Sequence, residues 1–134
     1  MIQYKIKDKM NSIMLEPKLE ELYVLNTFIE KIIMKRDFQL DLIVEEVFVN
    51  IVNYSQCNFI NVKTKFKNNI FTIEFIDDGM KFNPLLKKDH EFPDSIDDAP
   101  IGGLGIYLST QLSDSVDYFY INGENHFKIK KNIM

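Results

Sequence analysis

The sequence predicts an α+β fold, a two-layer sandwich in which helices cover one face of a mixed, mostly antiparallel sheet. One observation is that segments with a period of two, typical of half-buried strands, come in neighbouring pairs separated by short turns. Another is that two segments with helical periodicity follow the first strand and precede the first of these pairs. The expected order is strand, helix, helix, strand, strand, loop, helix, strand, strand.

Helices are expected in three places. Pro17 suits the first turn of a helix, and apolar residues recur at helical spacing from there to Met34. The segment from Gln39 to Gln56 carries a broad apolar face, which indicates a second helix packed on the core. A shorter helix is expected over residues 104–112.

Strands are expected over 2–15 with a break near Asp8, and over 59–67, 70–76, 116–121 and 126–133. Asn68-Asn69 predicts a tight turn within the first pair, and the segment Asn122–Asn125 joins the second pair. Lysines alternate along the segment 59–67. We interpret them as the solvent face of the sheet, and a docking patch is the alternative.

Length and composition favour a single globular domain over residues 1–134. The net charge of -4 argues against general attraction to nucleic acid, so no direct nucleic-acid partner is expected. Cys57 is the only cysteine, which excludes an intrachain disulfide and fits a reducing, cytoplasmic compartment. No stretch approaches the roughly 18 apolar residues of a membrane span, and no signal segment is evident, so we expect neither export nor membrane attachment.

Polar side chains share one face of the helix expected over 39–56. Glu46 and Asn50 are four residues apart, so they stack one turn above the other. A carboxylate and an amide would then project together from one helix, as in a binding or catalytic site. A solvated helix face is the alternative interpretation of this pair.

Two segments that contain glycine lie further along the chain. Asp77-Asp78-Gly79 ends a strand, where a carboxylate can accept a hydrogen bond from an exocyclic amine and glycine lets the backbone approach a flat ring. Gly102-Gly103-Leu104-Gly105 opens a helix, and the exposed N–H groups there favour a polyphosphate. Taken singly, each segment also fits ordinary turn chemistry.

The segment from Met80 to Pro100 shows no sustained periodicity. An irregular loop of about twenty residues within a compact domain is more often a functional lid than a linker. We therefore expect a lid over residues 80–100.

Together and in this order, the three motifs resemble those of the GHKL (Bergerat-fold) histidine-kinase-like ATPases, most closely the serine-protein kinase/anti-sigma factor group. The segment Glu46-x-x-x-Asn50 resembles the N box of that family. Asp77-x-Gly79 resembles the first glycine box, and Gly103-x-Gly105 the second. The resemblance covers nearly the whole chain and implies the Bergerat ATP-binding fold.

The resemblance also implies what each matched residue does. Asn50 would bind the Mg²⁺ that bridges the phosphates of ATP. Asp77 would accept a hydrogen bond from the adenine amine, with Gly79 beside the base. Glu46 would serve as the general base, since the helical phase favours it over Glu45. Backbone N–H groups for the phosphates would come from Gly103, Leu104 and Gly105.

Some positions depart from the pattern of the family. Lys81 stands where many relatives have a second glycine, although its ammonium group could reach phosphate instead. Tyr54 follows the N box at a position that often carries histidine or another basic residue. Ala99 stands before Pro100, where relatives often have arginine, and this bears on phosphoryl transfer more than on nucleotide binding.

The activity that the resemblance implies is that of an ATP- and Mg²⁺-dependent protein serine kinase and anti-sigma factor of bacteria. Its expected partners are a STAS-type anti-anti-sigma protein, which it would phosphorylate, and a sigma factor, which it would sequester; a homodimer is left open. An ATP-binding regulatory module that transfers no phosphate is the alternative, and a scaffold whose motifs are turn chemistry is a third. Neither His90, in the expected lid, nor His126, in the last strand, is expected to accept phosphate.

Overall fold

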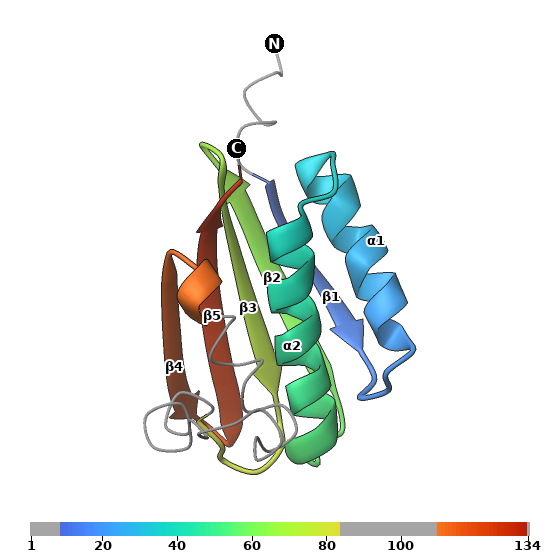
Figure 1. Cartoon of the computed structure of the whole chain (residues 1–134). Helices are drawn as coiled ribbons and strands as arrows, with labels where there is room; N and C mark the ends of the chain where they lie inside the picture. Colours follow the sequence, from blue (N-terminus) through green and yellow to red (C-terminus); the bar gives the residue numbers. More distant parts are fainter. Residues whose placement is uncertain (1–8, 84–109, 134) are drawn as a thin grey trace, which may run out of the picture.

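The computed structural model describes residues 9–83 and 110–133. Its sheet has the strand order β1-β2-β3-β5-β4, and every pair of neighbouring strands is antiparallel. The helices α1 and α2 lie side by side on one face of this sheet (Figure 1). The predicted α+β sandwich with helices on one face is therefore confirmed, and the described sheet is antiparallel throughout rather than mixed.

The elements follow the predicted order along the chain. Their bounds are β1 Lys9–Leu15, α1 Glu21–Ile33, α2 Phe38–Tyr54, β2 Ile60–Lys67, β3 Ile70–Asp77, β4 Ser115–Ile121 and β5 Glu124–Asn132. Helix α1 begins later than expected because the residues after Pro17 form a turn, in which Glu21 N–H donates to the Lys18 carbonyl at 3.0 Å. No helix within the described ranges is long and apolar enough to cross a membrane.

Parts of the prediction lie outside the described residues. These are the strand expected before Lys9, the lid beyond Asn83 and the segment with Gly103, Leu104 and Gly105. Of the helix expected over 104–112, residues 110–112 are described, and they are helical.

The start of α2 fixes how that helix meets the sheet. Asp37 lies just before the helix in an extended conformation, and its Oδ1 accepts a hydrogen bond from Leu40 N–H at 2.8 Å. This caps the helix and satisfies one of its unpaired N–H groups. From there the apolar face runs along the sheet, and it also buries one polar residue, Asn50.

Both hairpins are closed by two residues with positive φ, which is typical of the turns that match the twist of antiparallel strands. Asn68 and Asn69 have φ of 53° and 67°, and Asn122 and Gly123 have φ of 54° and 78°. The second turn is tighter than expected, so β5 already begins at Glu124. Asn125 is therefore a strand residue rather than part of the turn.

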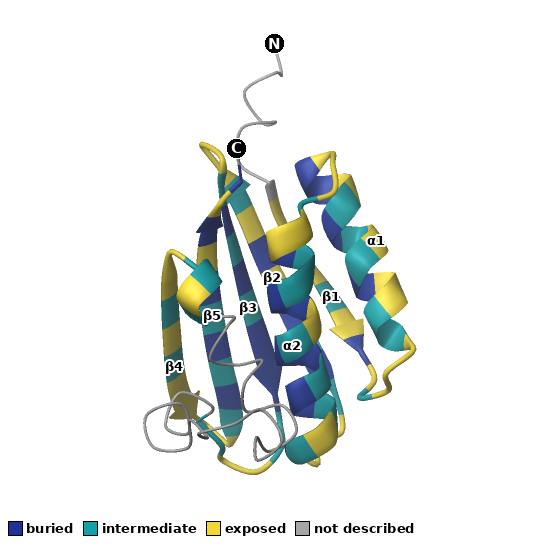
Figure 2. Cartoon of the chain, viewed as in Figure 1, coloured by how far each residue is buried: buried dark blue, intermediate teal, exposed yellow. Residues whose placement is uncertain are grey.

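The core lies between the helices and the inner face of the sheet (Figure 2). Along β3 the buried residues Phe71, Ile73 and Phe75 alternate with residues on the outer face. Asp77 takes the next inward position, at the end of the strand, and is only 3% exposed. The same alternation thus carries a carboxylate to the edge of the core, beside the helix that buries Asn50.

Candidate functional site

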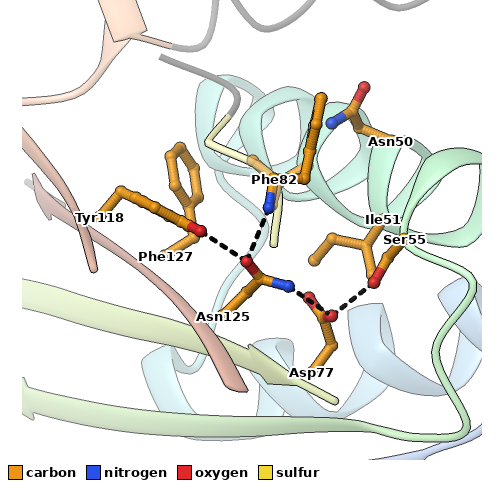
Figure 3. A pocket seen from close by; sticks show the side chains of 9 residues that line it. Asn50, Ile51, Ser55, Asp77, Phe82, Tyr118, Asn125 and Phe127 are labelled. Atoms are coloured by element: carbon orange, nitrogen blue, oxygen red, sulfur yellow. Dashed lines mark hydrogen bonds between the residues drawn. The ribbon is translucent and has the colours of Figure 1, made fainter. Parts of the chain in front are cut away.

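A pocket opens between α2 and the inner face of β3, β4 and β5 (Figure 3). The free space in and in front of the pocket, with its open mouth included, is about 350 Å³. Apolar side chains with a few polar groups form the wall, an arrangement typical of ligand pockets. The lining residues are Val47, Asn50, Ile51, Ser55, Asp77, Phe82, Tyr118, Asn125 and Phe127.

Asp77 is held by hydrogen bonds from three directions. Its Oδ1 accepts from the Ser55 hydroxyl, from Gly79 N–H at 2.9 Å and from Asn125 Nδ2 at 3.1 Å. Among the described residues, none donates a hydrogen bond to Oδ2. The carboxylate is therefore fixed in the pocket wall with one oxygen left to accept from a ligand.

The Asn125 side chain connects Asp77 to two other parts of the site. Its Nδ2 also donates to the Met80 carbonyl at 2.7 Å, while its Oδ1 accepts from Phe82 N–H at 3.0 Å and from the Tyr118 hydroxyl. Because the Phe82 N–H group can only donate, the Asn125 Oδ1 must face it and Nδ2 must face Asp77. Asn125 therefore directs its N–H donor at Asp77, and this hydrogen bond stabilises the ionised, accepting form of the carboxylate.

Tyr118 contributes to this arrangement from β4. Burial raises the pKa of the Tyr118 hydroxyl, so the group stays protonated and can donate to Asn125. The network thus joins β3, β4, β5, the end of α2 and the loop after β3 (Figure 3).

Gly79 is required by a close approach between the loop after β3 and the end of α2. A Cβ at this position would lie 1.9 Å from Ser55 Oγ and 2.2 Å from the Ser55 carbonyl oxygen. The same carbonyl accepts a hydrogen bond from Met80 N–H at 2.9 Å. The φ of Gly79 is not positive, so the closeness of Ser55, rather than the backbone conformation, requires glycine here.

Asp78 makes different contacts from its neighbour. Its carboxylate accepts from Asn58 N–H at 2.7 Å, Asn58 Nδ2 at 2.9 Å and Phe59 N–H at 3.2 Å. Desolvation raises the pKa of Asp78, but these hydrogen bonds outweigh it and hold the pKa below its ordinary value. Asp78 therefore organises the entry to β2, while Asp77 lines the pocket.

Asn50 lies on another side of the pocket, on α2. It is 6% exposed, and Figure 3 shows no hydrogen bond between its amide and the other side chains drawn. The Asn50 side chain therefore lies in the pocket wall and takes no part in the hydrogen-bond network around Asp77.

Glu46 lies one helical turn before Asn50 and is half-buried, but it is not among the lining residues. Partial burial, with a smaller contribution from the Glu45 carboxylate, raises the pKa of Glu46 above its ordinary value. The two candidate bases, Glu45 and Glu46, thus differ in burial, since Glu45 is exposed on the helix surface.

The two atypical positions near the pocket both have aromatic neighbours. The Tyr54 ring stacks on Phe82, with ring centroids 6.3 Å apart. The Lys81 ammonium lies 5.6 Å from the centre of the Tyr120 ring. Ala99 lies outside the described residues.

Sequence reasoning missed Ser55, Phe82, Tyr118 and Asn125. A signal for Asn125 was present, because period-two alternation from Phe127 and Ile129 places residue 125 on the inner face. A polar side chain at an inward position of a strand is unusual unless a partner satisfies it. The other three residues are revealed only by contacts between distant segments.

Replacement of Gly79 by alanine should reduce the free energy of unfolding by about 3 kcal/mol, because the new methyl group overlaps backbone atoms of Ser55. Urea denaturation measures the change. The matched control is Gly123→Ala, where a Cβ meets nothing within 4 Å and only the positive φ of 78° is unfavourable. The control should cost about 1 kcal/mol. Equal losses in the two variants would contradict a close approach at Gly79.

Comparison with known proteins identifies the family of this chain. Residues 20–131 match the model of the histidine kinase-like ATPase domain. The histidine kinase AdeS of Acinetobacter baumannii is similar in fold, with a TM-score of 0.54 and 11% identity over 93% of this chain and 68% of that chain. No match is found among curated proteins. Since the family model covers most of its length, the chain belongs to the histidine kinase-like (GHKL) ATPase domain family, whose members bind ATP.

Proposed function

We propose that the chain is an ATP- and Mg²⁺-dependent protein serine kinase and anti-sigma factor that acts in the bacterial cytoplasm. The observation that carries the proposal is the Asp77 carboxylate, with Oδ1 bound by three donors and Oδ2 available in the pocket wall.

The pocket would take the adenine of ATP. A carboxylate accepts hydrogen bonds and cannot donate them, so Asp77 suits the exocyclic amine of adenine and repels the carbonyl oxygen of guanine. The apolar side chains of Val47, Ile51 and Phe127 would contact the faces of a planar base. Asn125 supports this recognition by keeping its own donor directed at Asp77.

Asn50 fits the chemistry of a Mg²⁺ ligand, because Mg²⁺ prefers oxygen ligands and usually keeps several waters. Within the described ranges, no group of three or more His, Cys, Asp or Glu side chains could hold a metal ion. One amide oxygen from Asn50, with phosphate oxygens and water, is a sufficient ligand set. When bound, the ion would neutralise charge on the phosphates. The glycine segment 103–105 would supply backbone N–H groups to those phosphates.

Glu46 would be the base that removes a proton from the attacking serine. In that step the serine oxygen forms a bond to the γ-phosphorus, the bond from the γ-phosphorus to the β,γ-bridging oxygen breaks, and ADP leaves. The hydroxyl proton goes to the Glu46 carboxylate. The raised pKa of Glu46 brings the group closer to working pH, which makes it a better base than an exposed glutamate.

A base at Glu46 also favours a hydroxyl group over histidine as the acceptor of the phosphoryl group. A neutral imidazole attacks through a nitrogen lone pair and needs no base to remove a proton first. His126, the histidine within the described residues, lies on the outer face of the sheet, where its Nδ1 is 2.9 Å from Glu74 Oε2. It is therefore separated by the sheet from the pocket.

The serine would belong to a STAS-type anti-anti-sigma protein, and a sigma factor would be the partner that the chain sequesters. Support for these partners comes from the resemblance of the ordered motifs and of the run Asp77–Pro84 to the serine-kinase group. A homodimer is compatible with the proposal.

The second candidate is a regulatory module that binds ATP without transferring phosphate. The observation that favours it is that Glu46 does not line the pocket, whereas Asn50 and Asp77 do. In that case nucleotide would only control which partner is bound.

Replacement of Asp77 by asparagine should weaken ATP binding by about 10- to 100-fold, because a charged acceptor for the adenine amine is lost. Fluorescence anisotropy with a labelled ATP analogue measures the affinity. The control is Asp78→Asn, which alters the adjacent carboxylate but leaves the pocket wall intact. Comparable losses in the two variants would show that the effect is structural and would contradict direct recognition by Asp77.

Replacement of Glu46 by glutamine should slow phosphoserine formation on the cognate STAS protein by about 10²- to 10⁴-fold while ATP affinity stays unchanged. Radiolabelled ATP with Mg²⁺ provides the measurement, and Glu45→Gln is the matched control. Only the ionised carboxylate accepts a proton, so the wild-type rate should fall as pH drops through the raised pKa of Glu46.

Each outcome of the transfer experiment separates the two candidates. Wild-type protein that binds ATP but forms no phosphoserine would support the silent regulatory module. Unchanged transfer by Glu46→Gln would instead contradict Glu46 as the base.

A further inference from the structure

The face of the sheet opposite the helices carries a shallow, open depression of about 450 Å³. It lies at the β2–β3 hairpin, and three of the six side chains around it are lysines. We call this group the lysine patch. Its members are Lys65, Lys67, Asn68, Ile70, Thr72 and Lys130.

Strand register brings the patch together from three strands. Lys65 on β2 pairs with Thr72 on β3, and Thr72 pairs with Lys130 on β5. Neighbouring strands lie about 4.8 Å apart, so the two lysines flank the threonine with their Cα atoms roughly 10 Å from each other. Lys67 is two residues beyond Lys65 on the same face. Lys65, Lys67 and Lys130 are all exposed.

The six residues around the depression include three lysines and no acidic side chain. Within the described ranges, neither Lys65 nor Lys130 forms an ion pair with a carboxylate. The nearest row of the sheet contains Glu74, whose carboxylate is bound to His126 Nδ1 at 2.9 Å. Asp114 lies beside Lys130, since its N–H donates to the Lys130 carbonyl at 2.9 Å, and its carboxylate accepts a hydrogen bond from Asn132 N–H. The patch is therefore a cationic area on a chain of net charge -4.

We propose that the lysine patch docks an acidic segment of a partner protein. Carboxylate side chains complement the ammonium groups of Lys65 and Lys130, Thr72 offers a hydroxyl between them, and Ile70 offers a small apolar contact. Nucleic acid is a poorer fit, because lysines lack the bidentate fork with which arginine recognises phosphate.

The patch is separate from the nucleotide pocket in two respects. It lies on the outer face of the sheet, whereas Asp77 lies on the inner face. The patch also lies near Ile70, the first residue of β3, whereas Asp77 is the last residue of that strand. A partner held at the patch would therefore leave the pocket open.

The test uses the full chain, labelled with ¹⁵N, and a hexaglutamate peptide as the probe. Addition of the peptide at low salt should shift the amide resonances of Lys65, Thr72 and Lys130, and the affinity should fall as salt rises. The double variant Lys65→Glu with Lys130→Glu should lose at least tenfold in affinity. Lys31→Glu with Lys35→Glu is the matched control, because these exposed lysines lie at the end of α1 and just beyond it.

A second double variant controls for misfolding of the charge-reversed protein. Lys65→Gln with Lys130→Gln removes the charges without reversing them and should also weaken the peptide, while binding of the fluorescent ATP analogue stays unchanged. The proposal is overturned if the shifts map elsewhere, if the patch variants bind the peptide normally, or if a single-stranded octanucleotide binds the patch more tightly than the peptide. Loss of ATP binding in wild-type protein would contradict the proposed function and leave the docking result intact.

Discussion

The fixed carboxylate of Asp77 is the constraint on which the rest of the site depends. A buried carboxylate without partners would be strongly unfavourable, and here three donors converge on one of its oxygens. Those donors come from the end of α2, from the loop after β3 and from β5. Consequently the position of the helix, the course of the loop and the register of the last hairpin are all tied to a single side chain.

Much of the architecture could be predicted because its causes are local. Alternating residues predicted both hairpins, and the paired asparagines predicted the tight turn of the first hairpin. Helical spacing predicted the apolar face of α2 and the stacking of Glu46 on Asn50. The all-antiparallel pairing could not be fixed in the same way, since it depends on which strands become neighbours after the chain has folded.

The candidate site was only partly predictable for a related reason. The Asn125 amide bonds Asp77 across 48 positions of sequence, and no local pattern reveals a contact of that separation. The reason for Gly79 is likewise tertiary, because the atoms that exclude a side chain belong to Ser55. Asn50 and Asp77 were identified through the order of motifs, and the structure places both in the wall of one pocket. Gly103, Leu104 and Gly105 lie outside the described residues and stay predictions.

The sheet separates the two surfaces on which binding is proposed, with the pocket inside and the lysine patch outside. The proposed nucleotide site depends on whether Asp77 recognises the amine of adenine. Calorimetric titration of the wild-type chain with ATP and with purine riboside triphosphate, which lacks only the 6-amino group, measures this directly. Loss of a hydrogen bond to a charged acceptor predicts that the analogue binds about 10- to 100-fold more weakly than ATP. Equal affinity for the two nucleotides would contradict recognition of the adenine amine by Asp77.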